Sequence, residues 1–135
     1  MTSFSFTKIV VSDLARSVAF YERVLGMKPV MHFEREDLEE IGLRFSEEEG
    51  PAPTLVLMKP AGDAPIVLGN GWGPLGFVTP DIAALFALAR QLGSRIVEEP
   101  KEMQEIGVSV GYVEDPDGHP LEIVQQLGRS GAPRS

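Results

Sequence analysis

One carboxylate in this sequence stands where a strand pattern predicts partial burial. Glu122 lies in the segment Pro120–Gln125, and alternation along a strand places it on the same face as Pro120 and Val124. A carboxylate among such neighbours must pair with a cation, bind a metal or take part in chemistry, because burying a lone charge is costly. Glu122 is therefore the first candidate catalytic residue, as a general base.

Two cationic side chains are the next candidates. Lys8 shares a strand face with Phe6, two residues away, and we expect it to pair with Glu122 if Glu122 is half of a buried ion pair. Arg44 can hold an anionic ligand group through parallel N–H bonds. The competing interpretation of Arg44 is a solvated strand residue.

Two stretches of the chain repeat one order of elements and would position these residues. Asp13 and Asp81, 68 residues apart, each follow a short apolar run and precede a helical pattern. An Asp at that point caps a helix by accepting backbone N–H bonds. Gly26 and Gly93 end the two patterns, as glycines in the left-handed conformation do.

Each predicted helix has one apolar face and is followed by three strand candidates. The faces are Leu14, Val18, Tyr21 and Leu25 in the first helix, and Ile82, Leu85, Phe86, Ala89 and Leu92 in the second. The strands are predicted at 28–33, 41–45 and 54–58, and again at 95–99, 108–113 and 120–125.

The chain therefore reads βαβββ twice. The halves cover about residues 6–58 and 74–126, and a Gly- and Pro-rich linker, residues 59–73, joins them. Because each half has few strands, we expect both to pack as one α+β domain, residues 1–126. In it, two βαβββ modules form a curled mixed sheet around a shared pocket. Residues 127–135 are predicted to be a disordered tail.

Three motifs resemble a known family. Val11–Met27 resembles the opening strand and helix of this family. Leu68–Gly73 resembles the segment before the second-half strand of glyoxalase I. Val113–Ile123, which contains an Asp-Pro-Asp-Gly turn, resembles the closing hairpin of the family. Over about residues 6–126, the chain resembles the glyoxalase / bleomycin-resistance / extradiol-dioxygenase superfamily, also called vicinal oxygen chelate. The pattern is most similar to glyoxalase I.

The resemblance implies a metal position that this chain does not keep. The four ligands of glyoxalase I fall at Phe6, Val56, Pro74 and Glu122, and the three of the extradiol dioxygenases at positions 6, 74 and 122. Phe, Val and Pro side chains offer no lone pair to a divalent cation. We therefore expect no metal and no cofactor.

The resemblance also implies which residues line a ligand pocket. Trp72 and Met103 fall in segments that line the substrate pocket of relatives, although ordinary packing is an alternative role for both and for Tyr112. The candidate ligand-binding residues are Phe6, Lys8, Arg44, Val56, Trp72, Pro74, Met103 and Tyr112. His32 and His119 match no ligand position, and we interpret them as polar residues near the surface or in a turn.

Three functions remain open. The apolar replacements favour a bleomycin-resistance-like protein that binds a small, largely apolar organic ligand without metal. The alternatives are a metal-dependent glyoxalase-like lyase or dioxygenase, and a metal-free isomerase or lyase with Glu122 as base.

Composition excludes several partners. The formal net charge is −8 and the basic residues are scattered, which opposes nucleic-acid binding. No apolar run is long enough to span a membrane, and the first residues lack a signal-peptide pattern, so we expect a cytoplasmic protein. There are no cysteines, and so no disulfides. The expected partners are a small molecule and a second copy, since glyoxalase I and many relatives form homodimers.

Overall fold

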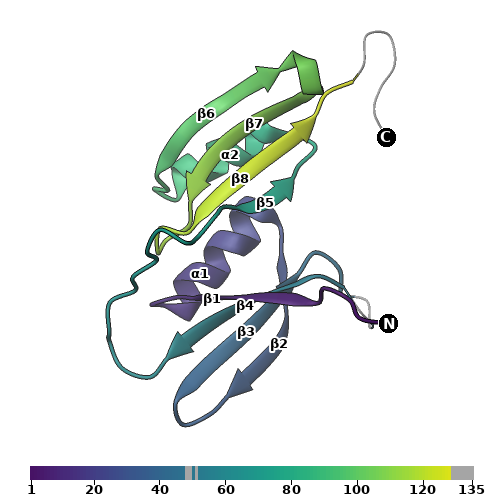
Figure 1. Ribbon diagram of the computed structural model, residues 1–135. Helices are drawn as coiled ribbons and strands as arrows, with labels where there is room; N and C mark the ends of the chain where they lie inside the picture. The colour runs from purple at the N-terminus through teal and green to yellow at the C-terminus, as the bar shows by residue number, and fades with distance from the viewer. Residues whose placement is uncertain (48–49, 51, 129–135) are drawn as a thin grey trace. The chain divides into compact units, whose positions relative to one another are not determined.

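The computed structural model describes residues 1–47, 50 and 52–128 (Figure 1). The chain divides into two compact units, Met1–Val67 and a second that begins at Leu68. The boundary falls inside the predicted linker. Each unit is a four-stranded mixed sheet with one main helix, so the prediction of two βαβββ modules is confirmed.

The first unit runs through β1 (Phe6–Val10), α1 (Leu14–Phe20), a π-helical turn (Tyr21–Leu25), β2 (Lys28–Glu34), β3 (Leu38–Arg44) and β4 (Thr54–Pro60). The strand order is β1-β4-β3-β2. The β1–β4 pair is parallel, and the other pairs are antiparallel. The first strand thus lies beside the last one of its unit.

The second unit repeats this topology. It runs through β5 (Leu75–Val78), α2 (Ile82–Gln91), β6 (Ile96–Met103), a 3₁₀ turn (Gln104–Ile106), β7 (Val108–Glu114) and β8 (Pro120–Gln126). The order is β5-β8-β7-β6, again with a parallel pair between the first and last strands. Leu127 donates its N–H to the Gly107 carbonyl, and residues 129–135 of the predicted tail lie outside the described residues.

Both helices begin and end as predicted. The Asp13 carboxylate accepts the Arg16 N–H at 3.0 Å, and the Asp81 carboxylate accepts the Ala84 N–H at 3.0 Å. After the helices, Gly26 and Gly93 have φ angles of 81° and 75°. These angles lie in the left-handed region, which other residues adopt at a cost.

The buried face of the first helix differs from the predicted one. The buried residues are Leu14, Ser17, Phe20, Tyr21 and Val24, whereas Val18 and Leu25 are only half-buried. A π-helical turn holds more residues than an α-helical turn, so it rotates the apolar face relative to the regular spacing used for the prediction. In α2, the predicted Ile82, Leu85, Phe86 and Ala89 are buried, whereas Leu92, which caps the helix, is 39% exposed.

Each helix covers one face of the sheet of its own unit. In the first unit α1 contacts β4, and Ile9, Leu43 and Leu57 are almost fully buried. In the second, α2 contacts β6, β7 and β8 above Val113, Leu121 and Ile123. At Gly111 an added Cβ would lie 2.5 Å from the Phe86 ring, so only glycine allows this approach of α2 to the sheet.

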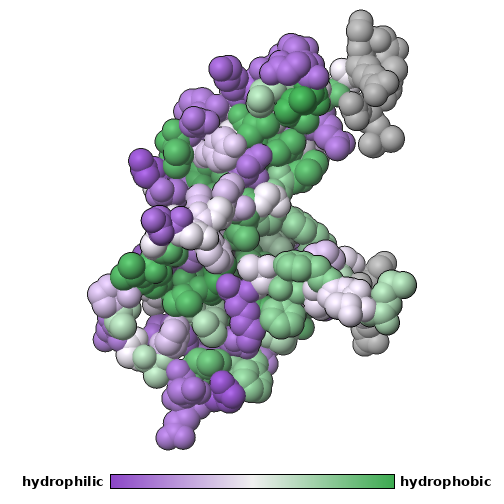
Figure 2. Space-filling model, viewed as in Figure 1, coloured by the Kyte–Doolittle hydropathy of each residue, from purple (hydrophilic) through white to green (hydrophobic). Residues whose placement is uncertain are grey.

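The opposite face of each sheet is left without a helix from its own unit. Hydrophobic side chains reach the surface in both units (Figure 2), and Phe6, Met31 and Phe33 are among those exposed in the first. Neither helix among the described residues has the length and apolar character needed to cross a bilayer. The candidate site residues lie mainly on the uncovered faces.

Candidate ligand-binding site

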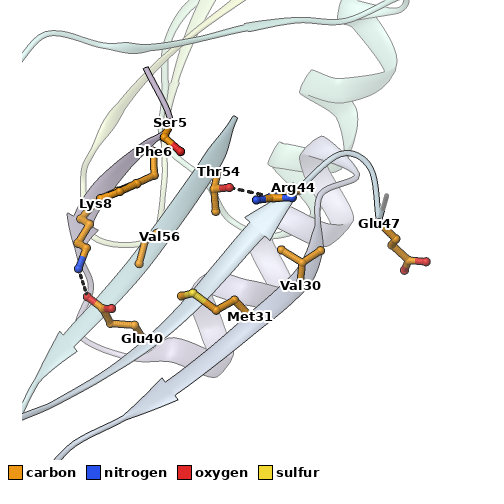
Figure 3. A pocket seen from close by; sticks show the side chains of 10 residues that line it. All are labelled: Ser5, Phe6, Lys8, Val30, Met31, Glu40, Arg44, Glu47, Thr54 and Val56. Carbon is orange, nitrogen blue, oxygen red and sulfur yellow. Dashed lines mark hydrogen bonds and ion pairs between the residues drawn. The ribbon is translucent and has the colours of Figure 1, made fainter. Parts of the chain in front are cut away.

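The uncovered face of the first sheet holds a pocket of about 450 Å³ (Figure 3). Strand pairing aligns its residues in rows, because Lys8 is in register with Val56, Val56 with Gly42, and Gly42 with Met31. The lining residues are Ser5, Phe6, Lys8, Val30, Met31, Glu40, Arg44, Glu47, Thr54 and Val56. Four predicted ligand-binding residues, Phe6, Lys8, Arg44 and Val56, are thus brought together.

The middle of the pocket is apolar. Val56 is buried in the floor, and Phe6 and Met31, 53% and 40% exposed, stand over the sheet as accessible hydrophobic side chains (Figure 3). Gly42 leaves space between its neighbours in this floor, because a Cβ there would lie 3.2 Å from both the Met31 Cβ and the Thr54 Cγ2. An aromatic or aliphatic group of a ligand can be buried here, and its burial would remove little polar surface of the protein from water.

A half-buried ion pair forms one end of the pocket. Lys8 Nζ donates to Glu40 Oε2 at 2.8 Å, and the Glu40 side chain is only 7% exposed. The prediction paired Lys8 with Glu122 instead, and Glu40 was not among the predicted site residues. The sequence pattern missed Glu40 because the predicted strand began at Ile41, whereas β3 begins at Leu38 and includes Glu40 in its paired region.

Arg44 stands at the other end of the pocket and is half-buried. Its Nε donates to Thr54 Oγ1 at 2.8 Å, and its Nη1 donates to the Gly50 carbonyl at 3.0 Å. The Thr54 hydroxyl in turn donates to the Ala52 carbonyl at 3.1 Å. These contacts orient the guanidinium, and neither Thr54 Oγ1 nor the Gly50 carbonyl carries a charge.

Glu122 and Tyr112 face each other across neighbouring strands of the second unit. Tyr112 in β7 is in register with Glu122 in β8 on one side and with Glu98 in β6 on the other. Burial raises the pKa of the Tyr112 hydroxyl, and so do the charge of Glu122, the hydrogen bond with it and the charge of Glu98. Within the second unit, the partner of Glu122 is thus the Tyr112 phenol.

The remaining predicted ligand-binding residues also belong to the second unit. Met103 ends β6 in register with Val108 and is half-buried. Pro74 is exposed and directly precedes β5. Trp72, 37% exposed, packs edge-on to His119 with ring centroids 6.1 Å apart. Trp72 thus has a packing partner on the closing turn.

His119 is buried, which corrects the interpretation of a residue near the surface. Only 1% of its side chain is exposed, and its Nδ1 lies 2.8 Å from Asp115 Oδ2. Asp115 Oδ1 also accepts the backbone N–H groups of Asp117 and His119. The sequence signal was the Asp-Pro-Asp-Gly turn, whose first Asp folds these donors around its own carboxylate. The predicted placement of His119 in a turn is correct.

The resemblance assigns Phe6, Val56, Pro74 and Glu122 to the metal position of the family, and only one of these four side chains carries a donor atom. Phe6 and Val56 belong to the hydrophobic part of the first pocket, and Pro74 has no donor atom to offer. Glu122 supplies the one carboxylate of the four positions. A single carboxylate does not satisfy the coordination that a catalytic transition metal requires.

Comparison with known proteins finds relatives that are named lactoylglutathione lyase. It is 31% identical over 121 residues to a probable lactoylglutathione lyase of Synechocystis sp., covering 88% of this chain and 92% of that protein. It is 29% identical over 123 residues to the lactoylglutathione lyase of Salmonella typhimurium, covering 88% and 89%.

Solved structures agree with the fold. Glyoxalase I of Zea mays superimposes with a TM-score of 0.79 at 24% identity, covering 90% of this chain, which spans only 44% of the maize chain. A glyoxalase family protein of Bacillus cereus superimposes with a TM-score of 0.80 at 15% identity, covering 95% and 96%. Residues 3–123 match the family described as the Glyoxalase/Bleomycin resistance protein/Dioxygenase superfamily, and the chain belongs to that superfamily.

Proposed function

We propose that this protein binds a small organic anion with an apolar or aromatic body, and that it does so without a metal at the position its family uses. The observation that carries the proposal is the pocket of the first unit. There, Phe6 and Val56 occupy two of the positions that the resemblance assigns to metal ligands, and a half-buried Arg44 lines the same pocket.

The size and lining of the pocket support this ligand class. Its volume, about 450 Å³, is within the roughly 300–1,000 Å³ typical of small-molecule sites. The hydrophobic side chains would bury the body of the ligand, and Arg44 would bind its carboxylate, sulfonate or phosphate. Lys8 is already neutralised by Glu40, so Arg44 is the stronger attraction for an anion.

Anilinonaphthalene sulfonate, an aromatic anion whose fluorescence rises in apolar sites, tests the proposal. We expect saturable binding by the native protein, weakened by Arg44→Gln and by Phe6→Ala. Arg95→Gln is the matched control, because it removes the same charge from an exposed arginine of the second unit that pairs with Glu114. Equal losses in the Arg44 and Arg95 variants would mean that net charge, rather than this pocket, attracts the probe.

A second candidate function rests on the relatives and on Glu122. Similarity along most of the chain to lactoylglutathione lyases, together with the retained carboxylate, supports a lyase or isomerase in which Glu122 is a general base. Lactoylglutathione lyase activity should be assayed with and without added Ni²⁺ or Zn²⁺. Metal-free turnover abolished by Glu122→Gln would support this candidate, whereas turnover that requires the metal would support the metal-dependent alternative.

The proposal extends to the oligomeric state. β2 is an edge strand of its sheet, and all its residues are exposed, including Val30, Met31 and Phe33. Such an edge is suited to contact with another chain. We therefore propose that the protein is a homodimer, and light scattering that gives the mass of one chain at micromolar concentration would contradict the dimer. We also propose that the protein is cytoplasmic.

A further inference from the structure

Three side chains with metal-binding groups meet on the β2–β3 hairpin, away from the pocket. His32 and Glu34 lie in β2, and Glu39 lies in β3 in register with Glu34. Alternation places them on the sheet face opposite to Met31 and Glu40, which line the pocket. One ligand atom from each of the three lies within 4.8 Å of the others.

We propose that His32, Glu34 and Glu39 form a Zn²⁺ site. One imidazole nitrogen and two carboxylate oxygens form a donor set suited to zinc, with coordination positions left for water. Zinc bonds to nitrogen and oxygen are about 2.0–2.2 Å long, so two ligand atoms on one ion are at most about 4.4 Å apart. Small side-chain rotations bring the three atoms within that limit.

The charges around the cluster favour a cation. Glu34 and Glu39 are like charges directly across a strand pair, which is destabilising without a counter-ion. His32 Nε2 lies 2.7 Å from Glu39 Oε2, so the imidazole already points at one of the carboxylates. A dication would replace this single contact with bonds to all three side chains.

Two basic side chains of the first unit, Lys59 in register with Glu39 and Arg35 next to Glu34, have other partners. Lys59 is in register with Glu39, but its Nζ donates to the carbonyls of Pro60 and Gly62 at 3.2 and 3.3 Å. Arg35 Nε lies 3.5 Å from Asp37 Oδ1. Bound zinc would therefore link the exposed edge strand β2 to β3. This site is separate from the family's metal position and independent of the proposed ligand.

The chain contains two histidines, so NMR of the imidazole nitrogens reports on the site directly. Untagged protein should be titrated with Zn²⁺ alone. We expect saturable shifts of the His32 ring signals, with little change for the buried His119. His32→Ala and Glu39→Gln should each weaken zinc binding by about tenfold or more, since even the loss of a partner outside the ligand shell costs about that much.

Glu36→Gln is the matched control, because it removes the same charge from the exposed turn of the same hairpin without touching the three ligands. We expect native zinc affinity from this variant and no comparable binding of Ca²⁺, which prefers oxygen ligands alone. The proposal is overturned if millimolar Zn²⁺ leaves the His32 signals unmoved. Equal affinity in His32→Ala, or a loss in Glu36→Gln as large as in Glu39→Gln, would overturn it too.

Discussion

The two units share a topology but differ in the chemistry of their uncovered sheet faces. In the first, the row that crosses the four strands is Lys8, Val56, Gly42 and Met31. In the second, the matching row is Gly76, Glu122, Tyr112 and Glu98. The first row has a hydrophobic centre and, at one end, a lysine that pairs with Glu40, whereas the second holds two carboxylates beside a phenol. The same strand positions can thus carry opposite chemistry without a change of fold.

This difference indicates where an anion can bind. Glu122 and Glu98 would repel an anionic group from the second face, whereas the first is the face on which we propose that Arg44 binds one. Glu122, which the resemblance assigns to a metal-ligand position, lies on the face that also carries Glu98. Val56, its counterpart in the first unit, forms the floor of a hydrophobic pocket.

Exchanging the two counterparts should give the largest effect. Val56→Glu places a carboxylate in a floor where Val56 is 4% exposed, and Lys8, already paired with Glu40, can compensate it only in part. We expect the free energy of unfolding to fall by about 2–4 kcal/mol, because a buried charge without a full partner is costly. Urea denaturation measures this change.

The reverse change supplies the control for that comparison. Glu122→Val removes a half-buried carboxylate from the second face, and we expect the free energy of unfolding to change by no more than about 1 kcal/mol. If Val56→Glu and Glu122→Val change the free energy of unfolding equally, the two faces do not differ in how well they accommodate a carboxylate.

Breaking the ion pair of the first unit should have a smaller effect. Lys8→Met leaves the Glu40 carboxylate buried without its cation, which for a fully buried pair costs about 3–5 kcal/mol. Because the Lys8 side chain is 42% exposed, water screens part of the interaction, and we expect a loss of about 1–3 kcal/mol.

A double variant tests the cause of that loss. Lys8→Met combined with Glu40→Met removes both charges and should recover most of the stability, as measured by thermal and urea unfolding. A double variant no more stable than Lys8→Met alone would show that the loss comes from packing rather than from a stranded carboxylate.

The topology could be predicted from the sequence because its signals are local. Asp13 and Asp81 cap helices through bonds to residues three positions away, and Gly26 and Gly93 end them by their own backbone conformation. Periodicity located every strand, but β6 extends four residues past its predicted end at Glu99, and its pairing shifts on both sides of Glu98.

The candidate site was predicted less completely because it depends on register and on side-chain partners far apart in the chain. The pairing of Lys8 with Glu40 spans 32 residues, and no local pattern contains it. The buried His119 likewise contacts Trp72, which comes from a distant part of the chain. The residue types that line the pocket could be found from the sequence, whereas their contacts required the structure.

The smallest predicted effect concerns ionisation of the second face. The pKa of Tyr112 lies above the ordinary 10.0 because of burial and then because of the charge of Glu122 and the hydrogen bond with it. The folded state therefore holds the phenol proton more tightly than the unfolded state. The stability from this difference is fully present below pH 10.0 and is lost as the pH rises through the folded-state pKa.

Glu122→Gln should lower the pKa of Tyr112, because it removes the carboxylate charge that opposes ionisation of the phenol. Ultraviolet titration measures this shift, and Tyr112→Phe shows which of the two tyrosine signals belongs to Tyr112. In the first unit, Glu40→Gln is the control, since Glu40 pairs with Lys8 rather than with a phenol. An unchanged Tyr112 titration in Glu122→Gln would mean that burial alone holds the proton. The negative charge of Glu122 on the second face would then have no effect on the ionisation of Tyr112 beside it.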